Sequence, residues 1–162
     1  MSTPKAVTSL QGRNFPAPVV WGTVLFVVLL DQLTKHIALN RLAPDGSVPV
    51  LEGIFHLTLV RNTGAAFGFL NSRPLVFTVF SALAALIIFA VIALRIAVNS
   101  AVERFALALI LGGTIGNLLD RVRLGYVVDF FDLKVWPVFN VADSFITVGA
   151  VMLAVTLIKS RK

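Results

Sequence analysis

The sequence predicts an all-α membrane protein, a bundle of four transmembrane helices with a small extracytoplasmic β-sheet between the first and second helices. Of its 162 residues, 57% are hydrophobic and 14% are charged, whereas about 25% of the residues of an average soluble domain are charged. Four apolar runs approach the roughly 20 residues that cross a bilayer as a helix. These runs take roughly half of the chain and leave no room for a second domain, so we expect one integral membrane domain over residues 1–162.

The four predicted spans differ in polarity, and their expected bounds are about 19–39, 75–94, 105–121 and 141–158. The second span is the clearest, because it carries no charge and is long enough for about 30 Å of hydrocarbon at 1.5 Å per residue. The third span contains Gly112, Gly113 and Gly116. Small side chains let a neighbouring helix approach closely, so we expect this helix to lie inside the bundle.

The connection between the first two spans, at about residues 45–71, has a strand-like pattern. Ser47 to Leu70 is rich in Val, Leu, Phe and Thr, and Pro49 and Gly53 interrupt it. This composition favours strands over helix. We therefore expect the small β-sheet here, resting on the outer leaflet.

Basic residues predict the orientation of the chain in the membrane. Lys and Arg precede the first span, lie in the short second connection and close the chain, at positions Lys5, Arg13, Arg95, Arg104, Lys159, Arg161 and Lys162. Positive charge favours the cytoplasmic side, so both termini are expected there. The bias is modest, because the opposite side carries Arg41, Arg61, Arg73, Arg121, Arg123 and Lys134.

Charge and cysteine content exclude several kinds of function. The net charge is +6, which in a soluble protein would suggest nucleic acid as a partner. In a membrane protein this excess is explained by topology, so no nucleic-acid partner is expected. The chain has no cysteine, which excludes disulfides, thiolate catalysis and cysteine-bound zinc.

Polar residues gather near the outer ends of the predicted spans. A charged group near the centre of a membrane helix raises the free energy of insertion by about 2.5 to 3.5 kcal/mol, so such a residue is expected to have a structural or functional role. On the predicted topology, one level of the membrane holds Asp31, Lys35, Asn117, Asp120, Arg121 and Asp143, and Asp129 falls in the loop between the last two spans.

Helical spacing suggests how some of these residues pair. Asp31 and Lys35 are four residues apart, in the order that favours an ion pair, which is the simplest interpretation of both. Asn117 and Asp120 or Arg121 share one side of the third helix. An inward polar network explains these three better than direct catalysis.

Asn62, Asp129 and Asp143 each have a structural and a functional interpretation. Asn62 precedes small residues between apolar strands, either in a tight turn or in a substrate-binding loop. Asp129 and Asp143 could each be a capping or interfacial carboxylate, although Asn140 competes with Asp143 for the helix cap. Two carboxylates in a partly desolvated site would share one proton and activate water, as in aspartic peptidases. Spacing alone does not bring Asp129 and Asp143 together.

Two other classes of function remain open from the residues alone. Charge within a membrane also marks ion and substrate paths, so a small transporter or channel subunit is one alternative. A structural or assembly protein, with the polar cluster as a packing network, is another. The first predicts flux through vesicles, and the second predicts that neutral variants of Asp129 and Asp143 keep cellular function.

The chain resembles the bacterial lipoprotein signal peptidases, or signal peptidase II, in five blocks that occur in order across about residues 19–158. The blocks are Asp31-Gln32-Leu33-Thr34-Lys35, Asn62-Thr63-Gly64-Ala65-Ala66-Phe67, Gly116-Asn117-Leu118-Leu119-Asp120-Arg121, Val128-Asp129-Phe130 and Phe139-Asn140-Val141-Ala142-Asp143. The resemblance implies an aspartic endopeptidase of the bacterial inner membrane. Such an enzyme cuts diacylglyceryl-modified prolipoproteins just before the lipid-bearing cysteine, near the extracytoplasmic face.

The resemblance also implies roles for individual residues. It makes Asp129 and Asp143 the catalytic pair, and it implies neither a metal nor an organic cofactor. The expected partners are the lipidated prolipoprotein and membrane lipids, with the enzyme as a monomer. Asp120 is expected to orient Arg121. The other residues expected to bind substrate or support the site are Asn62, Gly64, Asn117, Arg121, Asn140, Asp31 and Lys35.

Overall fold

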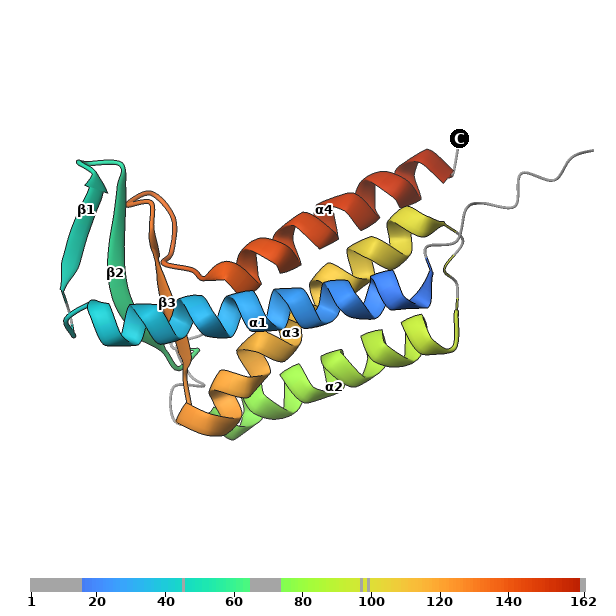
Figure 1. Ribbon diagram of the computed structural model, residues 1–162, viewed down its shortest axis with the longest axis horizontal. Helices are drawn as coiled ribbons and strands as arrows, with labels where there is room; N and C mark the ends of the chain where they lie inside the picture. The colour runs from blue at the N-terminus through green and yellow to red at the C-terminus, as the bar shows by residue number, and fades with distance from the viewer. Residues whose placement is uncertain (1–15, 45, 65–73, 97, 99, 161–162) are drawn as a thin grey trace, which may run out of the picture.

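The computed structural model describes residues 16–44, 46–64, 74–96, 98 and 100–160. Within them, long helices form an elongated bundle and a sheet stands at one end of it (Figure 1). The helices are α1 (Ala17–Arg41), α2 (Pro74–Ala93), α3 (Ala101–Leu124) and α4 (Val141–Ser160). All 4 are long and apolar enough to cross a membrane, which confirms the predicted transmembrane bundle.

Helix α3 is the central helix of the bundle. In its most apolar window 61% of the residues are buried, against 22% in α1 and 11% in each of α2 and α4. It passes between α2 and α4 (Figure 1). The expectation that the glycine-bearing helix lies inside the bundle is therefore confirmed.

Glycines allow α3 to approach its neighbours closely. A Cβ added at Gly112 would lie 2.7 Å from the Cβ of Val27 in α1, and one added at Gly113 would lie 2.5 Å from the carbonyl oxygen of Ala142 in α4. Both distances are too short for a carbon atom to be accepted without a shift of the neighbouring helix. The start of α4, which carries Asp143, is therefore held directly against α3.

The sheet combines strands from two connections. Strands β1 (Ser47–Leu51), β2 (Phe55–Asn62) and β3 (Val127–Asp132) are antiparallel, in the order β1-β2-β3. The first two lie where strands were predicted, and residues 65–71 of that region lie outside the described residues. The third strand comes from the connection between α3 and α4.

The prediction that Asp129 lies in a loop was wrong, because it lies in β3. Its neighbours Val127, Val128, Phe130 and Phe131 are β-branched or aromatic, which is a strand signal. A register shift in the β2–β3 pairing separates the part of β3 that holds Asp129 from the part that ends at Asp132. Such bulges re-aim side chains and are common beside active sites.

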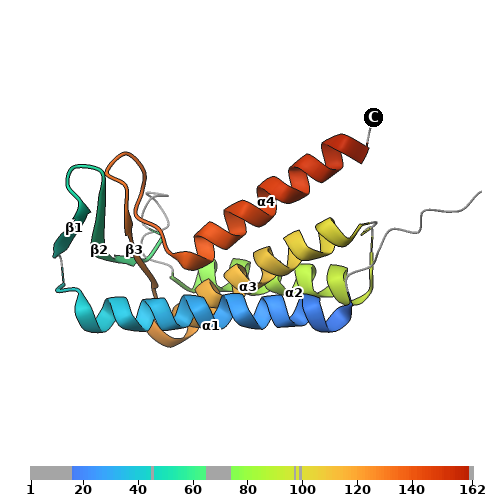
Figure 2. The same ribbon diagram turned by 45° about the horizontal axis from the view of Figure 1, so that its top comes forward.

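Helices α1 and α4 meet near the sheet and diverge away from it. The start of α1 and the end of α4 lie at the end of the bundle opposite the sheet (Figures 1 and 2). Near the sheet the two helices touch, since the amide of Ala142 donates a hydrogen bond of 2.9 Å to the carboxylate of Asp31. The polar residues singled out in the sequence lie at this end of the bundle.

Candidate active site

The structure brings Asp129 and Asp143 together around one asparagine. The Nδ2 of Asn140 donates to Oδ1 of Asp129 at 2.7 Å. The Oδ1 of the same side chain accepts from the backbone amide of Asp143 at 2.9 Å, and the amide of Asn140 donates to Oδ2 of Asp143 at 3.3 Å. Asn140 thus caps α4, as expected from its position, and its fully buried side chain binds one carboxylate while its backbone binds the other.

A second amide, that of Asn117 on α3, completes this arrangement. Its Nδ2 donates to Oδ1 of Asp143 at 2.8 Å. Its Oδ1 accepts from Asn140 at 3.0 Å and from the ammonium of Lys35 at 2.9 Å. These two donors determine which end of the Asn117 amide faces Asp143, because only the oxygen can accept from both.

Asn62, at the end of β2, approaches Asp129 from the sheet. Its Nδ2 donates to Oδ2 of Asp129 at 2.8 Å, and its Oδ1 accepts from the amide of Gly64 at 2.8 Å. Gly64 has a φ of +86°, and a Cβ there would lie 2.6 Å from the ring of Phe77. The hydrogen bond from Gly64 fixes the amide of Asn62 that contacts Asp129, and the choice between a tight turn and a substrate-binding loop stays open. Ala65, Ala66 and Phe67 lie outside the described residues.

A buried ion-pair cluster lies beneath the two aspartates. The predicted pair forms, with Lys35 Nζ 2.9 Å from Oδ2 of Asp31. Lys35 is also 2.9 Å from Oδ2 of Asp120, and the side chains of the three residues are between 0% and 4% exposed. Such a cluster is tolerable only when every charge is paired and hydrogen-bonded.

The two carboxylates of this cluster also hold the backbone beside the candidate catalytic residues. Asp31 accepts from the amide of Ala142, the residue before Asp143. Asp120 accepts from the amide of Val128 at 3.0 Å, and Val128 is the residue before Asp129. The Lys35 cluster thus ties β3 and α4 to α1 and α3.

The expectation that Asp120 orients Arg121 stays a prediction, and the described contacts of the two residues are with other partners. The described hydrogen bonds and ion pairs of Asp120 involve Lys35, Val128 and Gln32. Arg121 is instead held by its own neighbours, since its Nη1 donates to the hydroxyl of Ser81 at 3.1 Å and to the carbonyl of Asn117 at 3.3 Å. A helical residue adjacent to Asp120 projects about 100° away from it, which explains the different partners.

Sequence reasoning missed two residues that support the site. Gln32 donates to Oδ1 of Asp120 at 3.0 Å and to the carbonyl of Gly116 at 3.1 Å, which joins α1 to α3. Ser81 of α2 holds Arg121. Both are polar residues within otherwise apolar spans, and the cost of burying an unpaired amide or hydroxyl was the signal that could have found them.

Burial of Asp129 perturbs its ionisation. Asp129 is only 1% exposed to solvent. Desolvation raises the pKa of the Asp129 carboxyl to about 6, the hydrogen bond from Asn62 opposes the rise, and the negative charge of Asp143 adds to it. A carboxyl that keeps its proton near pH 6 is suited to donate that proton in a reaction.

Two grooves include Asp143 in their linings. One, of about 340 Å³, lies between α2, α3 and α4 and includes Ser81, Asn117 and Arg121 in its lining. The other, of about 390 Å³, lies between α4 and the connection from β3 to α4, and Asp143 is its one charged lining residue among those described. Among the described residues, no group of three or more His, Asp or Glu side chains is arranged to hold a metal ion.

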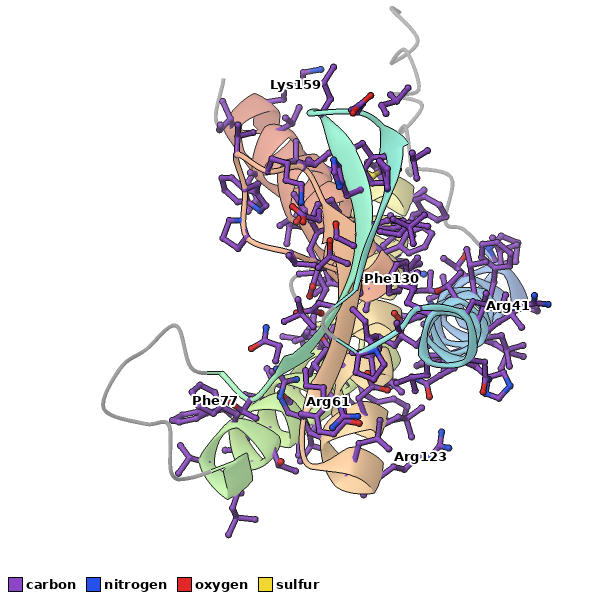
Figure 3. All side chains as sticks on the ribbon, turned by 90° about the vertical axis from the view of Figure 1, so that its left-hand side faces the viewer. Arg41, Arg61, Phe77, Arg123, Phe130 and Lys159 are labelled. Atoms are coloured by element: carbon purple, nitrogen blue, oxygen red, sulfur yellow. The ribbon has the colours of Figure 1, made fainter. Side chains whose placement is uncertain are left out.

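The remaining arginines near the sheet make no described contact with Asp129 or Asp143, and Arg123 reaches the network only through Gln32. Arg61 lies over the ring of Tyr126, with its guanidinium carbon 5.5 Å from the ring centre, and Arg123 donates to Gln32 at 3.2 Å. Seen from the sheet end, Arg41, Arg61 and Arg123 are well separated (Figure 3). Arg73 lies outside the described residues.

Comparison with solved structures places the fold among bacterial membrane enzymes. One such enzyme, solved by the in meso method at 2.3 Å resolution, superposes with a TM-score of 0.83 over 92% of this chain and 93% of its own, at 29% identity. A second, at 1.9 Å resolution, gives a TM-score of 0.82 over 93% and 98% of the two chains, also at 29% identity.

Comparison with curated sequences and a family model identifies the family. The lipoprotein signal peptidase of Caldanaerobacter subterraneus subsp. tengcongensis is 53% identical over 137 residues, which are 83% of this chain and 92% of that protein. The lipoprotein signal peptidase of Halothermothrix orenii is 41% identical over 89% of this chain and 98% of that protein. The signal peptidase (SPase) II family model matches residues 23–159. The chain therefore belongs to the signal peptidase II family, the bacterial lipoprotein signal peptidases.

Proposed function

We propose that this chain is an aspartic endopeptidase that cuts diacylglyceryl-modified prolipoproteins immediately before the lipidated cysteine. Family membership supports the cleavage of prolipoprotein signal peptides. The aspartic mechanism is supported by the two carboxylates, Asp129 and Asp143, that share Asn140. This shared contact is the observation that carries the proposal.

In the proposed mechanism, the pair holds one proton and Asp129 carries it. Asp143 takes a proton from a bound water as the water oxygen bonds to the scissile carbonyl carbon. Asp129 gives its proton to the carbonyl oxygen as that oxygen gains negative charge. When the tetrahedral intermediate collapses, its carbon–nitrogen bond breaks, and the nitrogen takes the proton from Asp143 and leaves as the amino group of the lipidated cysteine. One hydroxyl of the intermediate returns its proton to Asp129 as the new carboxyl group forms.

The surrounding residues would hold these carboxylates and the substrate. Asn62, Asn117 and Asn140 keep Asp129 and Asp143 in place, and Gly64 fixes the amide of Asn62. Arg121, half-buried in the groove beside Asp143, would contact substrate oxygen atoms. The positioning residues beneath the pair are Asp31, Lys35 and Asp120.

We propose that both termini are cytoplasmic and that the active site lies near the extracytoplasmic face. The start of α1 and the end of α4 lie opposite the sheet (Figure 1). Lys159 lies in the last turn of α4 and Arg161 and Lys162 follow it, and basic residues favour the cytoplasmic side. A signal peptide already passed across the membrane would then meet the enzyme at the sheet end. We expect the enzyme to act as a monomer and without a metal ion.

The direct test is cleavage of a synthetic lipidated prolipoprotein by the purified protein in detergent. We expect a single cut before the lipidated cysteine, with less than two-fold change after treatment with a metal chelator or with serine and thiol reagents. Product mass spectrometry measures the cut site. Loss of cleavage with the chelator would indicate a metal site, and a cut elsewhere would contradict the proposed specificity.

The pH dependence should reflect the raised pKa of Asp129. In the free enzyme Asp129 keeps its proton below about pH 6, so kcat/KM should fall by about ten-fold per pH unit above that value. The profile belongs to the pair rather than to one residue. It can be measured between pH 5 and pH 8. A rate that stays constant to pH 8 would contradict proton donation by Asp129.

The same pKa predicts a pH-dependent stability. Between pH 3.8, the ordinary pKa of an aspartate, and about pH 6, the raised pKa of Asp129, the folded protein holds a proton that the unfolded chain releases. The contribution is therefore fully present below pH 3.8 and is lost as the pH rises through 6, by at most about 3 kcal/mol. The Asp129→Asn variant should lack this change. Unfolding followed by tryptophan fluorescence would measure it independently of activity.

A further inference from the structure

The groove between α4 and the connection from β3 to α4 has no role in the mechanism above. Its described lining, here called the α4 groove, consists of Leu133, Trp136, Phe139, Asp143, Ser144, Thr147 and Val148. Its volume of about 390 Å³ is within the range of small-molecule sites, roughly 300 to 1,000 Å³. We propose that the α4 groove binds an acyl chain of the lipidated cysteine, an inference that rests on the proposed function.

The lining of the α4 groove is mostly apolar, which suits an acyl chain. Asp143 is the one charged residue among those described, and it lies at the catalytic end of the groove. The hydroxyl of Ser144 already donates to the carbonyl of Asn140 at 3.0 Å. A peptide backbone in the groove would leave N–H and C=O groups without partners, which is costly in an apolar site. An acyl chain has no such groups.

The other groove that includes Asp143, between α2, α3 and α4, is more polar than the α4 groove. That groove presents the guanidinium of Arg121, the amide of Asn117 and the hydroxyl of Ser81. These groups can hydrogen-bond peptide carbonyls or ester oxygens. The substrate carries a peptide backbone with polar groups and an apolar lipid on either side of one scissile bond. The groove with Arg121 suits the peptide backbone, the α4 groove suits the lipid, and both grooves include Asp143.

Exposed apolar residues of α4 connect the α4 groove with the bilayer. Val148, Val151 and Val155 of α4 are 51%, 58% and 45% exposed, and their spacing puts them along one side of the helix. This apolar line continues from the α4 groove toward the middle of the predicted span. An acyl chain could thus enter along α4 without leaving a hydrocarbon environment.

This route also determines what the groove contributes. A chain that moves from the bilayer to an apolar groove exchanges one apolar environment for another, so the hydrophobic effect adds little. The contribution is orientation, because a held chain places the neighbouring peptide bond at the aspartates. Blocking the groove should therefore affect lipidated substrates according to the length of their acyl chains.

The test compares Val148→Trp with the wild type on two substrates of one peptide sequence. One carries two palmitoyl chains and the other carries two butyryl chains. We expect kcat/KM to fall at least ten-fold for the long-chain substrate and less than two-fold for the short-chain one. Val122→Trp, at an exposed valine of α3 outside both grooves, is the matched control and should cleave both like the wild type.

Each other result overturns the proposal. An equal fall of kcat/KM for both substrates would show that the groove binds the peptide. An unchanged kcat/KM for both would show that the groove holds only bilayer lipid. If Val148→Trp does not fold, photolabelling of the wild type by a substrate with a diazirine in its acyl chain decides. Labels on Leu133 to Val148 support the proposal, and labels confined to α2 reject it. Undiminished cleavage by Asp129→Asn would instead contradict the proposed function.

Discussion

Asp129→Asn and Asp143→Asn are each expected to lower the rate of prolipoprotein cleavage by about a thousand-fold. The first removes the proposed acid and the second the proposed base. An asparagine keeps the size of the side chain and one acceptor oxygen, so contacts with Asn140 and Asn117 are partly retained. The rate in detergent with a lipidated prolipoprotein, compared with the wild type at the same pH, measures the effect.

A third carboxylate provides the matched control for this experiment. Asp132 lies in the same strand as Asp129, but its partners are Lys134 at 2.7 Å and Thr58 at 2.8 Å. The hydrogen bond from Lys134 lowers the pKa of Asp132 to about 2. Asp132→Asn should therefore keep cleavage within about two-fold of the wild type. The catalytic assignment fails if a folded Asp129→Asn or Asp143→Asn variant retains full activity.

Lys35→Met is expected to be the most destabilising single substitution among the candidate residues. It leaves Asp31 and Asp120 buried side by side without their cation, which costs about 3 to 5 kcal/mol in comparable buried pairs. Because these carboxylates hold the amides of Ala142 and Val128, β3 and α4 should also lose their relative position. We expect low yield, a lowered free energy of unfolding and greatly reduced cleavage.

Unfolding by sodium dodecyl sulfate, followed by the fluorescence of Trp21 and Trp136, would measure this loss. The triple variant Asp31→Asn, Lys35→Met, Asp120→Asn removes all three charges and keeps amide oxygens for the backbone contacts. It should be more stable than Lys35→Met alone. Lys159→Met, at the exposed end of α4, should match the wild type. Equal stability of Lys35→Met and the wild type would show that the cluster is not a structural tie.

Much of the fold followed from local pattern. The long apolar runs predicted the helices, because length and hydropathy are sufficient to recognise a membrane span. The small residues of α3 predicted its central place. The strand β3 was missed although its residues are β-branched or aromatic, because it lies alone between two helices and its partner β2 is distant in sequence.

The ion pair of Asp31 and Lys35 could be predicted because it lies within one helix. Its extension to Asp120 could not, since that contact depends on how α1 packs on α3. For the same reason the contacts of Asp120 with α1 and β3 could not be predicted from its neighbours in sequence. Residues close along the chain need not share partners in a helix bundle.

The membrane spans, the polar groups near one end of the helices and the resemblance to a peptidase family can all be read from the amino-acid sequence. The contact of Asp129 and Asp143 with one asparagine, Asn140, and the meeting of two unlike grooves at Asp143 are visible only in the folded chain. Membrane insertion depends on the free energy of transfer of local segments, which sequence records directly. The meeting of Asp129 in a strand with Asp143 in a helix depends on packing between segments that are separate in the chain, and no local pattern specifies it.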